Sequence, residues 1–328
     1  MSSSEGSFTI SLDFELFWGV RANRNLEDYS RHLLGVYEAI PQMLALFKKY
    51  DIHVTWATVG FLFYESIEEM KKNQPTILPE YQNQNVDPYL YLERLTKGSY
   101  DEEFIKMHGA SVLISEIKKG LNQEIATHTF SHFFTYEPYK NSKAFEEDIK
   151  EALYLGTQKN IALKSLVFPR NQVEEKSLEV LKKSTIESYR GNPKHWAYRD
   201  GDKPGKSFFL RLYRLFDTYM NLSGHHTTWP LFDNELIELK GSMMLRPYFS
   251  KLAYLEPLKI RRVKKSMKNA AKKGENFHLW WHPHNFGVNQ KENLKNLEAL
   301  LKYFQELKSS YNMRSLTMKE MVQHVRNN

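Results

Sequence analysis

The sequence predicts an α/β protein in which a mostly parallel β-sheet, open or closed into a barrel, is covered by helices. Short runs of β-branched and apolar residues alternate along the chain with longer segments of helical periodicity, and two polar stretches interrupt this alternation. The chain has 328 residues, of which 41% are hydrophobic, and this is enough for a large core. No linker or internal repeat divides it, so we expect a single domain over residues 1–328.

The expected elements follow one another in a simple order. Strands are predicted at 8–13, 52–60, 124–128, 165–168, 186–190, 236–244 and 277–281. Apolar residues at helical spacing predict helices at 28–50, 109–119, 142–158, 174–184, 256–273, 290–309 and from 317 onwards. The two polar stretches are expected to be inserts: the first, at 65–107, with short helices of its own, and the second, at 191–235, irregular.

Composition and charge exclude several classes of protein. The chain has no cysteine, which excludes disulfides, thiolate metal sites and cysteine nucleophiles. No apolar run approaches the roughly 20 residues of a membrane-spanning helix, and the first residues lack the features of a signal peptide, so a cytoplasmic protein is expected. The net charge of +7 favours anionic partners, but the sequence has no nucleic-acid-binding motif, and no nucleic-acid partner is expected.

Polar side chains follow several of the predicted strands, at the edge of the sheet where α/β proteins place their active sites. Asp13 and Glu15 end the first strand, and extended backbone directs residues two apart to the same side. His128 and His132 are four apart, so on one side of a helical turn they could share a metal ion. Taken separately, each pair could instead be structural.

Two further strands are followed by an arginine and by histidines. Arg170 comes after the strand at 165–168 and could bind a carboxylate through two hydrogen bonds, or form a structural salt bridge. His282 follows the strand at 277–281 and could be a general acid or a metal ligand, whereas packing in an aromatic turn is favoured for His284. Because all these groups follow strands, the sequence indicates one common site.

The order of these motifs resembles that of the polysaccharide deacetylases, the NodB-homology domain of carbohydrate esterase family 4. The matching segments are Ser11-Leu-Asp-Phe-Glu15, His128-Thr-Phe-Ser-His132, Phe168-Pro-Arg-Asn171 and Leu279-Trp-Trp-His-Pro283. Similarity at 55–60 and 315–321 extends the resemblance over most of the chain, apart from the two inserts. The resemblance implies a distorted (β/α) barrel of about seven parallel strands and the removal of an acetyl group from an N-acetylated sugar.

The resemblance also implies roles for six residues. The catalytic base, the arginine that orients it and the general acid would be Asp13, Arg170 and His282. The ligands of one divalent metal ion would be Glu15, His128 and His132. Glu15 would represent an Asp-x-Glu variant of the family motif, because Phe14 occupies the position next to Asp13. Such a ligand set suits zinc, the expected metal, and also cobalt, nickel or iron.

The expected substrate is an N-acetylated amino sugar of a surface-glycan precursor, which could be lipid-linked. Two alternatives remain open: a hydrolase of a non-sugar amide on the same fold, and a glycan-binding homologue without turnover. The basic helix at 256–273 and the segment 208–220 could contact an anionic membrane peripherally, although a solvated basic face is the favoured interpretation.

Overall fold

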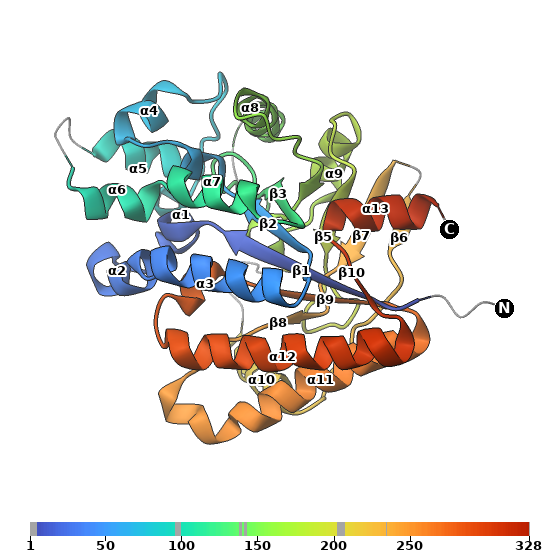
Figure 1. Ribbon diagram of the computed structural model, residues 1–328. Coiled ribbons are helices and arrows are strands. Elements are labelled where there is room, and N and C mark those ends of the chain that lie inside the picture. Colours follow the sequence, from blue (N-terminus) through green and yellow to red (C-terminus); the bar gives the residue numbers. More distant parts are fainter. Residues whose placement is uncertain are drawn as a thin grey trace.

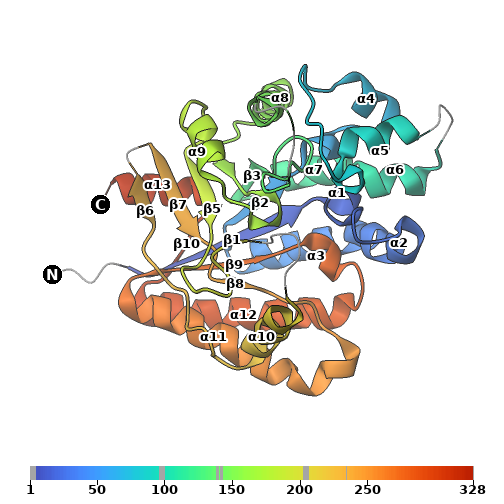
Figure 2. The same ribbon diagram turned by 180° about the vertical axis from the view of Figure 1, so that it is seen from behind.

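The computed structural model describes residues 5–95, 100–137, 140, 143–201, 207–233 and 235–327. In these residues a curled ten-stranded sheet forms a half-barrel with helices around it (Figures 1 and 2). The strand order is β6-β7-β5-β4-β3-β2-β1-β9-β8, with β10 beside β1, and neighbouring strands are parallel except β6 and β7. The predicted α/β fold, a distorted (β/α) barrel, is confirmed.

The predicted strands other than the one at 236–244 form, together with additional short ones. The strands are β1 Ser7–Phe14, β2 Val54–Thr58, β3 Gln123–Thr127, β4 Ser165–Leu166, β5 Ser188–Gly191, β6 Leu231–Asp233, β7 Leu236–Lys240, β8 Met243–Met244, β9 Asn276–Trp281 and β10 Arg314–Ser315. The prediction of one continuous strand over 236–244 is wrong, because this segment is divided into β7 and β8, which pair with different neighbours.

The helices lie mostly outside the sheet. They are α1 Leu16–Val20, α2 Leu26–Leu34, α3 Val36–Lys49, α4 Ile67–Lys72, α5 Pro88–Arg94, α6 Glu102–His108, α7 Ser111–Lys119, α8 Ala144–Gln158, α9 Glu175–Lys182, α10 Phe208–Tyr219, α11 Glu256–Lys273, α12 Gln290–Tyr311 and α13 Met318–Arg326. The helix expected at 28–50 is two helices joined at Gly35, where a Cβ atom would lie 2.0 Å from the carbonyl oxygen of Gly287. None of the helices in the described residues is long and apolar enough to cross a membrane.

The two ends of the sheet are joined by the short connection between β7 and β8. The backbone N–H of Gly241 donates to the carbonyl of Gly191 in β5 (2.9 Å), and that of Ser242 donates to the carbonyl of His278 in β9 (2.8 Å). Two consecutive residues therefore bond to β5 and to β9, which lie towards opposite ends of the strand order. This connection draws the sheet into the distorted barrel and brings β5 close to β1.

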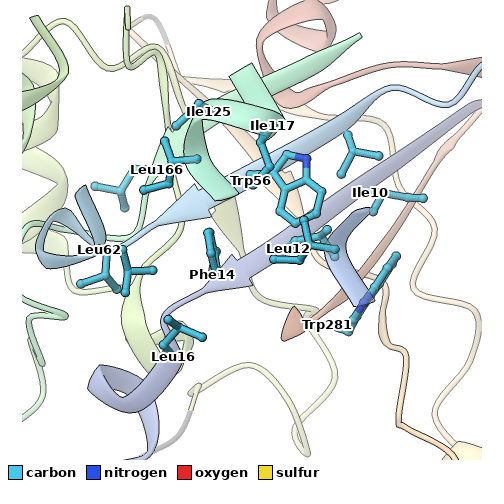
Figure 3. Close-up of a cluster of buried hydrophobic side chains, with 14 of the residues drawn as sticks. Ile10, Leu12, Phe14, Leu16, Trp56, Leu62, Ile117, Ile125, Leu166 and Trp281 are labelled. Carbon is cyan, nitrogen blue, oxygen red and sulfur yellow. The ribbon is translucent and has the colours of Figure 1, made fainter. Parts of the chain in front are cut away.

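The alternation of side chains along β1 separates the core from the site. Ile10, Leu12 and Phe14 belong to the large apolar cluster between the sheet and the outer helices (Figure 3). Ser11 and Asp13 have the opposite orientation and bond to side chains inside the barrel. Phe14 packs edge-on against Trp56, with ring centroids 6.3 Å apart, so it is a core residue.

Helix α13 covers the barrel at the N-terminal ends of its strands. Its buried side chains pack with apolar residues that point into the barrel, namely Ala57, Val167, Ile237 and Leu239. The first N–H groups of this helix donate to the side chains of Thr55 (2.8 Å) and Glu124 (3.0 Å) near the starts of β2 and β3. With this end covered, the site can open only at the C-terminal ends of the strands.

The two predicted inserts differ in character. The first contains α4, α5 and α6, and it is fixed over α1 by a hydrogen bond from the indole N–H of Trp18 to the carbonyl of His108 (2.7 Å). The second was expected to be irregular, but it contains the 12-residue helix α10, which packs against α11.

Candidate active site

The two carboxylates lie where β1 passes into α1. Asp13 and Glu15 are both buried, with exposures of 3% and 5%. Gly19, one turn into α1, leaves room for the second of them, because a Cβ atom at this position would lie 1.9 Å from the carboxyl carbon of Glu15. The tight passage from strand to helix thus places both carboxylates at the same end of the barrel.

The two histidines lie in the loop after β3. Thr129 and His132 have left-handed backbone angles, with φ values of 63° and 60°, so the predicted helical turn is wrong. Asp148 of α8 stabilises this loop by accepting hydrogen bonds from the N–H groups of Phe130 (2.7 Å) and Ser131 (3.0 Å) and from the Ser131 hydroxyl. The loop nevertheless brings His128 and His132 together, with ring centroids 5.1 Å apart.

Glu15, His128 and His132 form a buried group that could bind a metal ion. One ligand atom from each lies within 4.8 Å of the others, and Nε2 of His128 and of His132 lie 3.2 and 2.9 Å from Oε2 of Glu15. Nδ1 of His128 lies 2.7 Å from the carbonyl oxygen of Val167, which only accepts, so Nδ1 has a proton and, in the neutral imidazole, Nε2 presents a lone pair. This lone pair faces a carboxylate oxygen, and a shared cation would satisfy both atoms. Two imidazoles and one carboxylate are also the protein ligands of many catalytic zinc sites.

Asp13 is bound by an arginine that the sequence analysis did not identify. Arg190 of β5 donates from Nη1 to Oδ1 of Asp13 (2.6 Å) and from Nη2 to Oδ2 (2.7 Å). Nη1 also donates to the Ser11 hydroxyl (3.0 Å), and Nη2 to Oδ1 of Asn171 (2.8 Å). Burial alone would raise the pKa of Asp13, but the charge and the hydrogen bonds of Arg190 outweigh it, so the pKa lies below its usual value.

Arg170, which was predicted to orient Asp13, does not contact it. Its guanidinium lies over the ring of Phe134, 4.2 Å from the centroid, and 3.4 Å from a carboxylate oxygen of Glu137. The prediction is wrong because Arg170 lies beyond β4 in a short turn, with φ 53°, whereas Arg190 lies within β5 on the side that faces the barrel interior. The segment after β4 contributes Asn171 instead, which supports Arg190.

His282 borders both carboxylates. Its Nε2 lies 3.8 Å from Oδ2 of Asp13 and 3.5 Å from Oε1 of Glu15, and its side chain is 22% exposed. His284 stacks on it, with ring centroids 5.1 Å apart, but is buried, and burial lowers its pKa to about 3. The structure therefore brings together five of the six predicted residues: Asp13, Glu15, His128, His132 and His282.

A sequence signal for Arg190 existed but was not used. The strand at 186–190 was predicted, and Arg190 ends it just as the other candidate residues end or follow theirs. Asn171 lies within a motif that had been singled out for its arginine alone. Asp148 lies in the helix that follows the histidine motif and has no comparable signal, because only the folded loop brings it to residues 130 and 131.

Solved structures with the same fold include enzymes of several kinds. A protein of Mycobacterium smegmatis assigned as a polysaccharide deacetylase has a TM-score of 0.60 at 12% identity, over 100% of this chain and 92% of that one. The α-amylase AmyC of Thermotoga maritima has a TM-score of 0.55 at 9% identity, over 97% and 74% of the two chains. Puue allantoinase has a TM-score of 0.52 at 10% identity, over 100% and 92%.

No protein-family model and no curated protein matches the chain in sequence. At identities of 9–12% these likenesses concern the fold and leave the chemistry to the residues of the site. The half-barrel of this chain is similar over its whole length to the first of these structures. The chain therefore has the fold of the polysaccharide deacetylases.

Proposed function

We propose that the protein is a metal-dependent hydrolase that removes an N-acetyl group from an amino sugar of a glycan precursor. The observation that supports this proposal is the buried group of Glu15, His128 and His132 directly beside Asp13 and His282. When bound there, a divalent ion, with zinc the expected one, lowers the pKa of water and polarises an amide carbonyl.

In this proposal Asp13 is the general base. An amide is a weak electrophile, so the attacking water must lose a proton as it adds to the carbonyl carbon. Arg190 keeps Asp13 ionised and fixes both carboxylate oxygens, so that the base is charged and oriented before the substrate arrives. Asn171 in turn fixes the guanidinium.

His282 is proposed as the general acid. An amine leaves only when it is protonated, so a proton donor must lie within reach of the scissile nitrogen. The side chain of His282 lies beside both carboxylates and is 22% exposed, so a bound substrate could reach it, whereas His284 is buried. We therefore assign His284 a packing role beneath His282.

A second candidate function is the hydrolysis of a non-sugar amide. The likeness to an allantoinase, with a TM-score of 0.52, favours it as the alternative within the same fold. Release of acetate from N-acetylated amino sugars distinguishes the two, because an enzyme of the second kind would leave these sugars intact and open a cyclic ureide. A glycan-binding homologue would leave both substrates intact.

The first experiment compares metal content and acetate release in the wild type, Asp13→Ala and the double variant His128→Ala/His132→Ala. We expect about one metal ion per chain in the wild type and in Asp13→Ala, and none in the double variant. Acetate release should fall by at least about 10³-fold in both, since one lacks the base and the other the ion.

The proposal is wrong if the wild type takes up no zinc or cobalt, or if Asp13→Ala remains as active as the wild type. His53→Ala is a matched control, since this histidine lies near the start of β2 and bonds to Glu320, away from the site. It should retain both metal and activity.

A further inference from the structure

Apolar side chains exposed to solvent gather in one region of the described chain. Most of the large ones lie between residues 208 and 258, and three of them are more than two-thirds exposed: Phe208 (72%), Phe209 (78%) and Tyr254 (75%). Phe216 and Leu258 are about half exposed. Soluble proteins rarely leave such a cluster uncovered unless it contacts a partner or a membrane.

Helix α10 provides one part of this region. Its twelve residues, all described, are mostly leucine and aromatic residues, yet the single buried one is Asp217. Asp217 accepts hydrogen bonds from the N–H groups of Leu222 (2.9 Å) and Ser223 (2.8 Å) and lies 3.8 Å from Arg262 of α11. Polar contacts thus attach α10 to α11. Phe208, Phe209 and Phe216 stay exposed, whereas the other apolar residues of the helix are partly buried.

Helix α11 provides the other part. It contains eight lysine and arginine residues and one glutamate, which amounts to a formal charge of +7, equal to the net charge of the whole chain. Arg261, Lys265 and Lys268 lie on its exposed side, and none of them forms an ion pair with an acidic residue in the part of the chain that the structure describes. Leu258 extends the same side, since it lies three residues before Arg261, and the exposed Tyr254 lies in the short turn Ser250–Leu255 that precedes the helix.

A groove beside this helix has the same combination of properties. It lies between α11 and α12 and has a volume of about 950 Å³. Pro257, Ile260 and Tyr303 provide apolar surface. The charged lining consists of five cations, Arg261, Lys264, Lys265, Lys268 and Lys295, and two glutamates, Glu256 and Glu292. The positive charge therefore extends across α11 towards α12, while the exposed aromatic residues lie on the side of α10 and at the start of α11.

We propose that this region, the α10–α11 surface, docks on a lipid bilayer that contains anionic lipids. We define it by Phe208, Phe209, Phe216, Tyr254, Leu258, Arg261, Lys265 and Lys268. Protruding aromatic and aliphatic side chains beside a row of cations are typical of proteins that lie in the interface of an anionic membrane. A second copy of the chain is a poor occupant, because it would oppose two helices of charge +7.

The surface lies next to the candidate active site. A cavity of about 200 Å³ separates them, lined by Asp217 and Thr218 of α10 on one side and by Asn171 and Trp280 on the other. The ring of Trp280 is 5.8 Å from that of His282. Docking through α10 would therefore bring the opening of the barrel close to the lipid headgroups. The inference that the amino sugar is presented on a lipid rests on the proposed function, whereas the docking itself does not.

Sedimentation with vesicles tests the docking. The full chain is mixed with vesicles of phosphatidylcholine alone or with added phosphatidylglycerol, at low and high salt. We expect binding only to the anionic vesicles and weaker binding at high salt. Phe208→Ser/Phe209→Ser and Lys265→Glu/Lys268→Glu should each weaken the partition coefficient by about tenfold or more.

Matched variants control for general effects of polarity and charge. Leu121→Ser/Tyr154→Ser removes two exposed apolar residues elsewhere, and Lys72→Glu/Lys176→Glu makes the same change in net charge on α4 and α9. Both should bind like the wild type. The proposal is overturned if the wild type ignores anionic vesicles, if the control variants lose binding equally, or if Phe208→Ser/Phe209→Ser dissociates a dimer instead.

Acetate release from a soluble N-acetylated amino sugar, measured without vesicles, separates this proposal from the proposed function. All four double variants should retain it. If the wild type binds vesicles but releases no acetate, the proposed reaction is contradicted and the docking proposal stands. If it releases acetate but binds no vesicles, the docking proposal is contradicted and the proposed reaction stands.

Discussion

Both partners of the ion pair between Arg190 and Asp13 are buried, with side-chain exposures of 0% and 4%. A buried charge that loses its partner is costly, and here the partner also determines the direction of the proposed base. Asn171 and Ser11 occupy further N–H groups of the guanidinium, so its orientation is fixed by two strands and the turn after β4.

Arg190→Lys should reduce kcat by about 10²-fold with a smaller change in KM, because a lysine cannot bond to both oxygens of Asp13. Arg190→Gln should in addition destabilise the protein by about 3–5 kcal/mol in urea unfolding, since it leaves Asp13 buried without its counter-charge. Arg170→Lys is the matched control and should behave like the wild type. Equal losses in Arg170→Lys and Arg190→Lys would contradict the assignment.

Gly19 offers a second test at the scale of a single residue. In an ordinary helix, alanine is favoured over glycine by about 1 kcal/mol, so helix propensity predicts that Gly19→Ala stabilises the protein. The contact with the Glu15 carboxylate predicts the opposite, together with displacement of a metal ligand. We expect zinc affinity, measured by competition with a chelator, to fall by about tenfold or more. Unchanged affinity would show that Glu15 is not a ligand.

At the scale of the element, helix α6 is connected to the site helix α1 through a buried histidine. Nδ1 of His108 lies 2.8 Å from the carbonyl oxygen of Phe104, and its Nε2 lies 2.7 Å from the hydroxyl of Tyr91. The rings of Phe17 and Trp18 pack against it edge-on. Burial lowers the pKa of His108 to about 4, so the imidazole is neutral in the folded protein at neutral pH.

This histidine should make the stability depend on pH. Between about pH 6.5 and pH 4 this histidine binds a proton in the unfolded chain but not in the folded chain. The free energy of unfolding therefore has its full value above about pH 6.5 and decreases as the pH falls towards 4. In His108→Gln the free energy of unfolding should decrease less between pH 6.5 and pH 4, by up to about 3 kcal/mol. Urea unfolding at these two pH values measures the difference. Tyr91→Phe removes the hydrogen bond but keeps the imidazole, and its pH dependence should match that of the wild type. An unchanged slope in His108→Gln would refute the prediction.

At the scale of the whole molecule, the proposed metal ligands join two regions that are far apart in the sequence. Glu15 lies at the start of α1, and His128 and His132 lie in the loop that α8 supports through Asp148. An ion that binds only the folded chain stabilises it by mass action, by about 2.7 kcal/mol at a concentration 100 times its Kd.

Zinc should therefore raise the Tm by several degrees, and a chelator should reverse the rise. The double variant His128→Ala/His132→Ala should show no such response, measured by calorimetry with and without zinc. A response that persists in this variant would mean that the ion binds elsewhere. The Lys72→Glu/Lys176→Glu variant is the control for weak zinc binding that results only from a changed surface charge.

The sequence by itself determined most of the longer strands of the sheet and the polar residues at or near their ends. Apolar alternation on β1 orients Phe14 towards the core and Asp13 towards the barrel interior, and this is local geometry that any strand of this pattern would share. The spacing of His128 and His132 likewise predicted their proximity, although the loop reaches it through left-handed residues instead of a helical turn.

Only the tertiary structure decided which arginine binds Asp13. Arg170 and Arg190 both lie at or just beyond the ends of neighbouring strands, and the choice depends on the curl of the sheet that β7 and β8 impose through Gly241 and Ser242. The exposure of α10 was undetermined for the same reason. Its pattern allows a buried or an exposed apolar face, and with Asp217 turned towards α11 the side chains of Phe208, Phe209 and Phe216 stay exposed. Long-range contacts decide such questions, and periodicity along the chain contains no information about them.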